Sequence, residues 1–199
     1  MEILRIDKQK RGRQILYTDA SLSFPLYERE TAALQIEEGT SLSEENWERI
    51  CEEILLPRAK SRALHILERM DRTEYQLRMK LREDHYPEEI VEAAVAYVKS
   101  YHYIDDLRYA QTFIRARQSS LSRLQLCRKL SERGISQETA EQAFLDEYTE
   151  TDAHLIDRYL EQKHYNPETT DKKETARLYR SLCSKGFSPS EVRRRMELY

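Results

Sequence analysis

The chain has 199 residues, 39 % of them hydrophobic and 35 % charged, with only four Gly and five Pro. This composition is typical of amphipathic helices and disfavours a glycine-rich sandwich or barrel, so we expect a mainly α fold. No apolar run approaches the roughly 20 residues that cross a bilayer. The basic N-terminus is not followed by an apolar segment, as a signal peptide would require. We therefore expect a cytoplasmic protein without a membrane partner.

The formal net charge of -3 conceals an alternation of acidic and basic segments. Residues 28–53 and residues 138–161 each carry a net charge of -7. Residues 58–82, 105–133 and 172–195 carry +5, +4 and +6. Basic segments of this kind are typical of surfaces that meet phosphates or acidic proteins.

The first 27 residues contain three short β-prone runs, at 3–6, 14–17 and 22–24, separated by polar turns. This pattern predicts a small N-terminal β-meander, followed by a helix at about 27–35.

A second helix is expected to start after Ser43, which has the position of an N-cap. Its apolar residues recur at i, i+3, i+4 and i+7. We expect this helix to end before Pro57, because proline removes a backbone donor, and Trp47 to anchor it on the helices that follow.

From about residue 59 the chain aligns with itself at offsets of 49 and 52 residues. Two leucines four residues apart recur at the same position of each copy: Leu77 and Leu81, Leu126 and Leu130, Leu178 and Leu182. The alignment predicts three tandem three-helix repeats in a curved, elongated array. Their helices are expected at 59–70, 74–84 and 87–100, at 106–118, 123–133 and 137–148, and at 152–163, 171–184 and 189–198. The predicted domains are an N-terminal extension, 1–57, and repeats at 58–103, 104–149 and 150–199.

Polar residues at the helix ends agree with this register. Thr73 and Ser122 begin capping-box patterns before the middle helices of the first two repeats, and Ser188 begins one at the last helix. Gly134 and Gly186 lie where a middle helix must end in a left-handed residue. His85 has that position in the first repeat, where it carries a steric cost.

Residues 103–117 read Tyr-Ile-Asp-Asp-Leu-Arg-Tyr-Ala-Gln-Thr-Phe-Ile-Arg-Ala-Arg. Asp105 or Asp106 can cap a helix here, and Tyr109 and Phe113 fall on its apolar side. With the following Leu-x-x-Lys-Leu-x-x-Arg-Gly-Ile run that ends at residue 135, this segment resembles the signature of the RecX family, regulators of the RecA recombinase. The resemblance covers about residues 59–199, and the N-terminal extension is similar to that of some longer members.

The resemblance implies a protein that binds in the groove of the RecA filament on single-stranded DNA. It also implies inhibition of the ATPase, strand-exchange and coprotease activities of RecA, and hence a role in homologous recombination, DNA repair and the SOS response. Two departures from the family pattern are His85 in place of glycine and a longer connection at 163–170. We expect a monomer that needs no cofactor.

Basic residues recur on the middle helix of each predicted repeat, and equivalent helices of a repeat array lie along one face. We therefore predict a basic stripe that contacts the RecA filament and, weakly and without sequence specificity, single-stranded DNA. The candidate binding residues are Arg78, Lys80, Arg115, Arg117, Arg123, Arg128, Lys129, Arg133, Arg177 and Arg180. Three alternatives stay open: the bases only solvate a helix face, the protein binds DNA non-specifically by itself, or it is a protein scaffold that contacts no nucleic acid.

Catalytic motifs are missing from the sequence. The five His form no HExxH pair, and there is no P-loop, GxGxxG or GxSxG. The three Cys are far apart and have no CxxC spacing, which predicts free thiols rather than a disulfide or a zinc site. We expect a protein that is not an enzyme and binds no metal.

Overall fold

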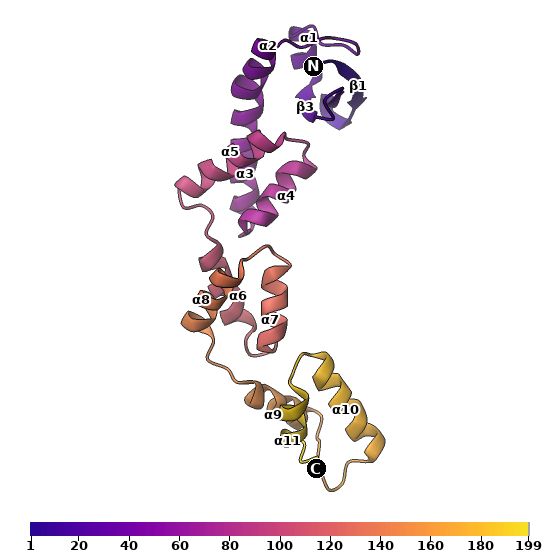
Figure 1. The fold of residues 1–199 in the computed structure, drawn as a ribbon, viewed down its shortest axis with the longest axis vertical. Coiled ribbons are helices and arrows are strands. Elements are labelled where there is room, and N and C mark those ends of the chain that lie inside the picture. Colours follow the sequence, from indigo (N-terminus) through magenta and orange to yellow (C-terminus); the bar gives the residue numbers. More distant parts are fainter. Residues whose placement is uncertain (199) are drawn as a thin grey trace. The chain divides into compact units, whose positions relative to one another are not determined.

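The structure is a computed structural model that describes residues 1–198, and it is mainly helical with a three-stranded sheet at the N-terminus (Figure 1). The chain forms two compact units, Met1–Asp105 and a second that begins at Asp106. The first unit contains β1 (Ile3–Lys8), a 3-10 turn (Lys10–Gly12), β2 (Arg13–Thr18), β3 (Ser23–Tyr27), α1 (Glu28–Ala33), α2 (Glu44–Arg49), a π-helical segment (Ile50–Leu55), α3 (Leu56–Arg69), α4 (Glu74–Glu83) and α5 (Glu88–Ser100). The second contains α6 (Asp106–Arg117), α7 (Arg123–Ser131), α8 (Gln137–Glu147), α9 (Asp152–Gln162), α10 (Lys172–Ser184) and α11 (Pro189–Arg195).

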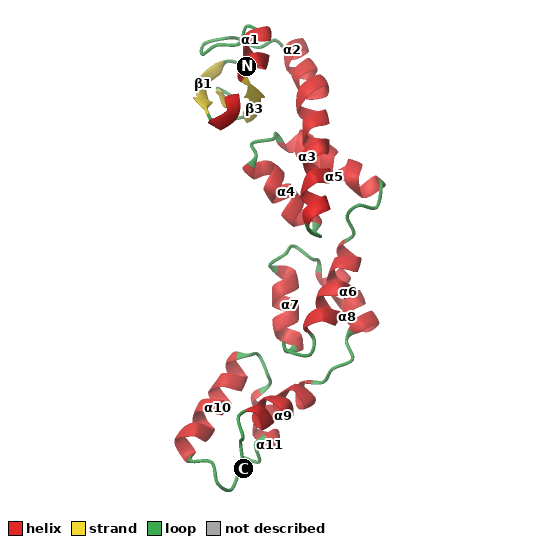
Figure 2. Cartoon of the chain, turned by 180° about the vertical axis from the view of Figure 1, so that it is seen from behind, coloured by secondary structure: helices red, strands yellow, loops and turns green. Residues whose placement is uncertain are grey.

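The predicted β-meander and all nine repeat helices are confirmed, the helices to within three residues at each end. Figure 2 shows the strands gathered at the N-terminal end and helices along the rest of the chain. We call α3 to α5 repeat 1, α6 to α8 repeat 2 and α9 to α11 repeat 3. The domain boundaries at 57, 103 and 149 stay a prediction.

The sheet is antiparallel, in the order β1-β2-β3, and it shares its core with repeat 1. Leu16 and Phe24 of the sheet and Leu77 and Leu81 of α4 are fully buried in one cluster. Trp47 lies against Phe24, with ring centroids 4.9 Å apart, so α2 is anchored on the sheet and not only on the repeat helices. The N-terminal extension is therefore an integral part of the first unit.

The helix that starts after Ser43 does not end before Pro57, and that prediction is wrong. The chain stays helical from Glu44 to Arg69 through a π-helical segment, in which the Leu56 N–H donates to the Cys51 carbonyl five residues back. Pro57 then lies in the first turn of α3. A missing backbone donor costs little at that position, so the proline is accommodated by the wider turn that precedes it.

The middle helix of each repeat ends in the same left-handed turn. The turn residues have φ values of 64°, 78° and 84°, at His85, Gly134 and Gly186. In each repeat the next N–H donates to the carbonyl of the second recurring leucine, at 3.1 to 3.3 Å: Tyr86 to Leu81, Ile135 to Leu130 and Phe187 to Leu182. This is the Schellman pattern, and it confirms the predicted helix ends, including the one at His85.

Two of the three predicted capping boxes are confirmed, and the one predicted at Ser188 is wrong. Thr73 and Ser122 accept hydrogen bonds from the backbone N–H three residues on, and both form complete capping boxes. Ser188 makes no such bond. Its hydroxyl instead lies 2.7 Å from the Ser190 hydroxyl, and the Glu191 side chain pairs with Arg194 at 2.6 Å.

The left-handed turns also join neighbouring parts of each unit. In the second unit the Ser122 hydroxyl donates to the Lys185 carbonyl at 2.7 Å. A Cβ atom on Gly186 would lie 3.2 Å from Ser122 Oγ, a tight contact that adds to the preference for glycine set by the φ value. In the first unit the sheet makes the matching contacts, because Arg13 donates to the Asp84 carbonyl and Ser23 Oγ lies 3.2 Å from His85 Nδ1. The sheet thus covers the turn of repeat 1 as repeat 2 covers the turn of repeat 3.

Candidate partner-binding surface

The basic residues of α4 are all held by acidic neighbours. Arg78 forms two hydrogen bonds to the Glu92 carboxylate, at 2.7 and 3.0 Å, and a third to Glu74 at 3.1 Å. Lys80 pairs with Glu83 at 2.6 Å, and the Arg82 guanidinium pairs with Glu88 of α5. The positive charges of this helix are therefore largely neutralised within repeat 1.

The basic residues of α7 are arranged differently. Arg123, Arg128 and Lys129 form no ion pair with any residue of the range 1–198. The Arg123 guanidinium lies over the Phe144 ring, 4.7 Å from its centroid. Arg133 lies over the Phe113 ring at the same distance and donates to the Lys129 carbonyl at 2.6 Å. Repeat 2 therefore presents positive charge that its own carboxylates leave uncompensated.

A groove of about 400 Å3 lies between α7 and α8, and we call it the α7/α8 groove. Two guanidiniums, an apolar wall and one carboxylate contribute to its lining: Arg123, Cys127, Arg128, Ser131, Ile135, Gln137, Ala140, Glu141 and Phe144. Burial raises the pKa of the Cys127 thiol, so this side chain is neutral at physiological pH. Cationic groups beside an apolar surface can hold an anionic group that carries apolar neighbours.

The other predicted residues have varied surroundings. Arg115 is paired with Glu147 of α8, with Nε 2.8 Å from the carboxylate, whereas Arg117 is exposed and has no ion pair in the described part of the chain. On α10, Arg177 lies 3.3 Å from Glu174. Arg180 donates to the Ala176 carbonyl of its own helix at 3.2 Å. Only Arg123 and Arg128 of the ten predicted residues line the α7/α8 groove.

The structural residues of the 103–117 segment lie where the sequence places them. Asp106 is the first residue of α6, and Asp105 precedes it. Tyr109 and Phe113 are half-buried against the core of repeat 2, with their rings stacked at a centroid distance of 6.5 Å. This segment therefore builds the scaffold that holds α7 and α8.

The repeat alignment contained a signal for the difference between α4 and α7. At the offset of 49 residues Arg78 aligns with Cys127, and Arg128 aligns with Met79. Lys80 aligns with Lys129, whereas the arginines occupy different positions on the two helices. Sequence reasoning grouped them by helix and missed both this shift and the contribution of Phe144.

Two further findings concern residues 1–198. None of their helices is both long and apolar enough to cross a membrane. They also bring together no group of three or more His, Cys, Asp and Glu side chains able to hold a metal ion.

Comparison with known proteins gives one consistent result. The family models for the first and second three-helix domains of RecX match residues 59–97 and 105–143. The regulatory protein RecX of Treponema pallidum is 32 % identical, over 78 % of this chain and 94 % of its own length. That of Clostridium acetobutylicum is 28 % identical, over 95 % of this chain and 91 % of its own.

Solved structures agree in fold. A crystal structure of a regulatory protein RecX superposes with a TM-score of 0.62 and 26 % identity, over 98 % of both chains. RecX from Lactobacillus salivarius gives a TM-score of 0.60 at 21 % identity, over 72 % of this chain and 95 % of that one. With matching repeat domains, related sequences along most of its length and the same fold, the chain belongs to the RecX family of regulatory proteins.

Proposed function

We propose that this protein binds the RecA filament on single-stranded DNA and inhibits its ATPase, strand-exchange and coprotease activities. Membership of a family of regulatory proteins supports a role in regulation rather than catalysis. The observation that carries the proposal is that Arg123, Arg128 and Lys129 form no ion pair within residues 1–198, and we assign them to the contact surface together with the α7/α8 groove.

Unpaired bases suit a surface that meets a polyanionic or acidic partner. A base already paired within the protein must lose that partner before it can bind another, whereas the α7 bases lose only water and counterions. Arg123 is also held over the Phe144 ring. This contact restricts the side chain before binding, which lowers the entropy lost when a partner is engaged.

The test is the ATPase rate of RecA on single-stranded DNA, titrated with wild-type protein and with the Arg123→Glu, Arg128→Glu, Lys129→Glu triple variant. We expect the concentration for half-maximal inhibition to rise at least about tenfold, which corresponds to about 1.4 kcal/mol of binding free energy. The charge-matched control is Arg49→Glu, Arg69→Glu, Lys163→Glu, which alters three exposed bases outside α7. Circular dichroism should show the same helix content in both variants.

Two results would contradict the proposal. The first is a triple variant that inhibits as well as wild type, since the α7 bases would then only solvate the helix. The second concerns the alternative of a protein that acts by covering DNA. If added free single-stranded DNA relieves inhibition in proportion to its concentration, the protein competes for DNA and makes no specific contact with the filament.

A further inference from the structure

A second basic site lies in the first unit, in a cleft between the sheet and α3 that we call the arginine cleft. Its volume is about 530 Å3. Within the described residues its lining has four arginines and one histidine but a single carboxylate: Arg11, Arg13, Pro25, Tyr27, Arg58, Ser61, Arg62, His65, Asp84 and Tyr86. None of these residues belongs to the surface assigned above.

Two distant segments of the chain supply the positive charges. Arg58, Arg62 and His65 follow one another at i, i+4 and i+7, so they share one face of α3. Arg11 comes from the 3-10 turn between β1 and β2, where it has a left-handed φ of 61°, and Arg13 is the first residue of β2. The packing of the sheet on repeat 1 brings the two groups together.

Carboxylates compensate only part of this charge. Arg13 and Arg62 share the Asp84 carboxylate, at 3.7 and 2.7 Å, and Arg58 pairs with Glu30. Arg11 has no ion pair within residues 1–198. Four guanidiniums against two carboxylates leave two positive charges. The Arg13 and Arg58 side chains are only 29 % and 24 % exposed, so water solvates them incompletely and an anion would be stabilised in the cleft.

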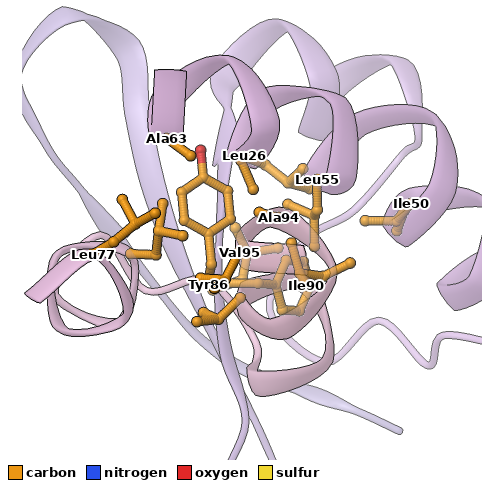
Figure 3. Close-up of a cluster of buried hydrophobic side chains, with 14 of the residues drawn as sticks. Leu26, Ile50, Leu55, Ala63, Leu77, Tyr86, Ile90, Ala94 and Val95 are labelled. Atoms are coloured by element: carbon orange, nitrogen blue, oxygen red, sulfur yellow. The ribbon is translucent and has the colours of Figure 1, made fainter. Parts of the chain in front are cut away.

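Tyr86 adds a neutral donor to the same cleft. Its ring lies among apolar side chains, with the hydroxyl as its polar end (Figure 3), and the whole residue is only 7 % exposed. No side chain or carbonyl in the described part of the chain hydrogen-bonds this hydroxyl, although it lines the cleft. Burial raises the pKa of Tyr86 to about 12, so the hydroxyl keeps its proton at neutral pH. The hydroxyl can therefore donate a hydrogen bond to a ligand in the cleft without first losing a partner in the described chain.

We propose that the arginine cleft binds a phosphate group, whose oxygens accept hydrogen bonds from the guanidiniums and from the Tyr86 hydroxyl. Guanidiniums match phosphate oxygens in pairs. Two uncompensated charges fit a phosphate dianion or two consecutive phosphodiesters better than a single carboxylate. The phosphate can belong to a nucleic-acid strand or to a free polyphosphate such as a nucleotide, since both offer the same oxygens. The site does not depend on the function proposed for α7.

The experiment uses the full-length chain at low salt and two phosphate probes. Inorganic pyrophosphate is measured by calorimetry, and a fluorescein-labelled oligothymidylate by anisotropy. We expect Tyr86→Phe to weaken binding about tenfold, because one hydrogen bond to a charged group is lost. Its thermal midpoint without ligand should stay close to that of wild type, since the hydroxyl has no partner to lose. Arg11→Gln should weaken binding similarly.

The control is Tyr75→Phe, which removes an exposed hydroxyl outside the cleft and should leave binding unchanged. Tyr86-dependent binding of pyrophosphate would identify a free phosphate compound as a ligand. The same dependence with oligothymidylate alone would identify the phosphodiester strand. The proposal is overturned if wild type binds neither probe, if Tyr86→Phe and Arg11→Gln both bind with wild-type affinity, or if polyglutamate binds as tightly as the probes. The α7 triple variant should keep this Tyr86-dependent binding whatever its effect on RecA.

Discussion

The helices α4 and α7 occupy the same position in two repeats, yet they use their positive charges in different ways. Both begin with a capping box and end in a left-handed turn. On α4, Arg78 and Arg82 reach across to Glu92 and Glu88 of α5. The aligned residues on α7 are Cys127 and Ser131, which cannot form such pairs. Both helices are basic in sequence, but the basic side chains of α4 form ion pairs within repeat 1, whereas those of α7 remain available to a partner.

The helix dipole treats the available charges of α7 unequally, because it favours Arg128 and Lys129 in the last turn. Arg123 lies in the first turn, where the helix dipole disfavours a cation, and that turn contains no acidic residue. Residues that break a local rule in this way are expected at sites that serve a partner.

The strongest test of the comparison reverses one charge on each helix. Arg78→Glu would place a third carboxylate beside Glu74 and Glu92, so we expect the free energy of unfolding of the first unit to fall by about 2 kcal/mol. The only tryptophan, Trp47, lies in this unit, and its fluorescence in a urea titration measures the change.

The matched change on α7 is Arg128→Glu, which removes no ion pair present in the described chain. It should alter stability by less than about 0.5 kcal/mol, read by circular dichroism. Equal losses for the two variants would show that the ion pairs of α4 are not what separates the helices.

A smaller loss of stability is expected when the pH is lowered. Burial acts to raise the pKa of Glu74, but hydrogen bonds from Lys99 and Arg78 outweigh it and lower this pKa below 4.5. A hydrogen bond from Arg78 likewise lowers the pKa of Glu92. The unfolded chain then takes up protons before the folded one, so this stability is complete above about pH 5 and is lost as the pH falls through the lower native values.

These partly exposed pairs should together contribute about 1 kcal/mol at neutral pH. We expect urea unfolding followed by Trp47 to show a matching loss between about pH 5 and pH 3, with a flatter profile for Glu92→Gln. Identical profiles for the two proteins would rule out a contribution from the Arg78–Glu92 pair.

The smallest predicted effect comes from removing acidic partners of the basic residues on α4. Glu88→Gln together with Glu92→Gln would free Arg82 and leave Arg78 with Glu74 as its remaining acidic partner in the described residues, which brings α4 closer to α7. We expect about a twofold gain in affinity for single-stranded DNA at low salt, and a dependence of log affinity on log salt steeper by up to about 1.4. An unchanged salt dependence would mean that the positions of the basic side chains, and not their ion pairs with carboxylates, decide which helix contacts a phosphate.

Features set by neighbouring residues were predictable from the sequence. Thr73 with Gln76 and Ser122 with Gln125 fix helix starts within four residues, and Gly134 and Gly186 fix helix ends by their backbone freedom. Even His85 was placed correctly, because the turn is decided by its position after the leucine pair. The two errors arose where more than one local arrangement satisfies the same residues. At Pro57 a π-helical turn accommodates the proline, and at Ser188 the Glu191 side chain pairs with Arg194 instead of completing a capping box.

Features that need two distant segments were not predictable. The Arg78 and Glu92 pairing depends on how α4 packs against α5, and charge counts do not contain that information. The arginine cleft joins Arg13 to Arg62 through Asp84, and these three residues lie far apart in the sequence. The sequence marked both regions as basic and left open which charges face solvent.

The π-helical segment Ile50–Leu55 also fixes an angular relation within the first unit. Each residue of an α-helix turns the chain by about 100°, and a π turn adds one residue without breaking the helix. Trp47, which contacts the sheet, precedes the segment, whereas Arg58 and Arg62 follow it. Removing one residue between them would rotate the arginines by more than a quarter turn relative to the tryptophan. The number of residues in the continuous helical stretch from Glu44 to Arg69 thus determines whether the sheet and the basic residues of α3 can face each other.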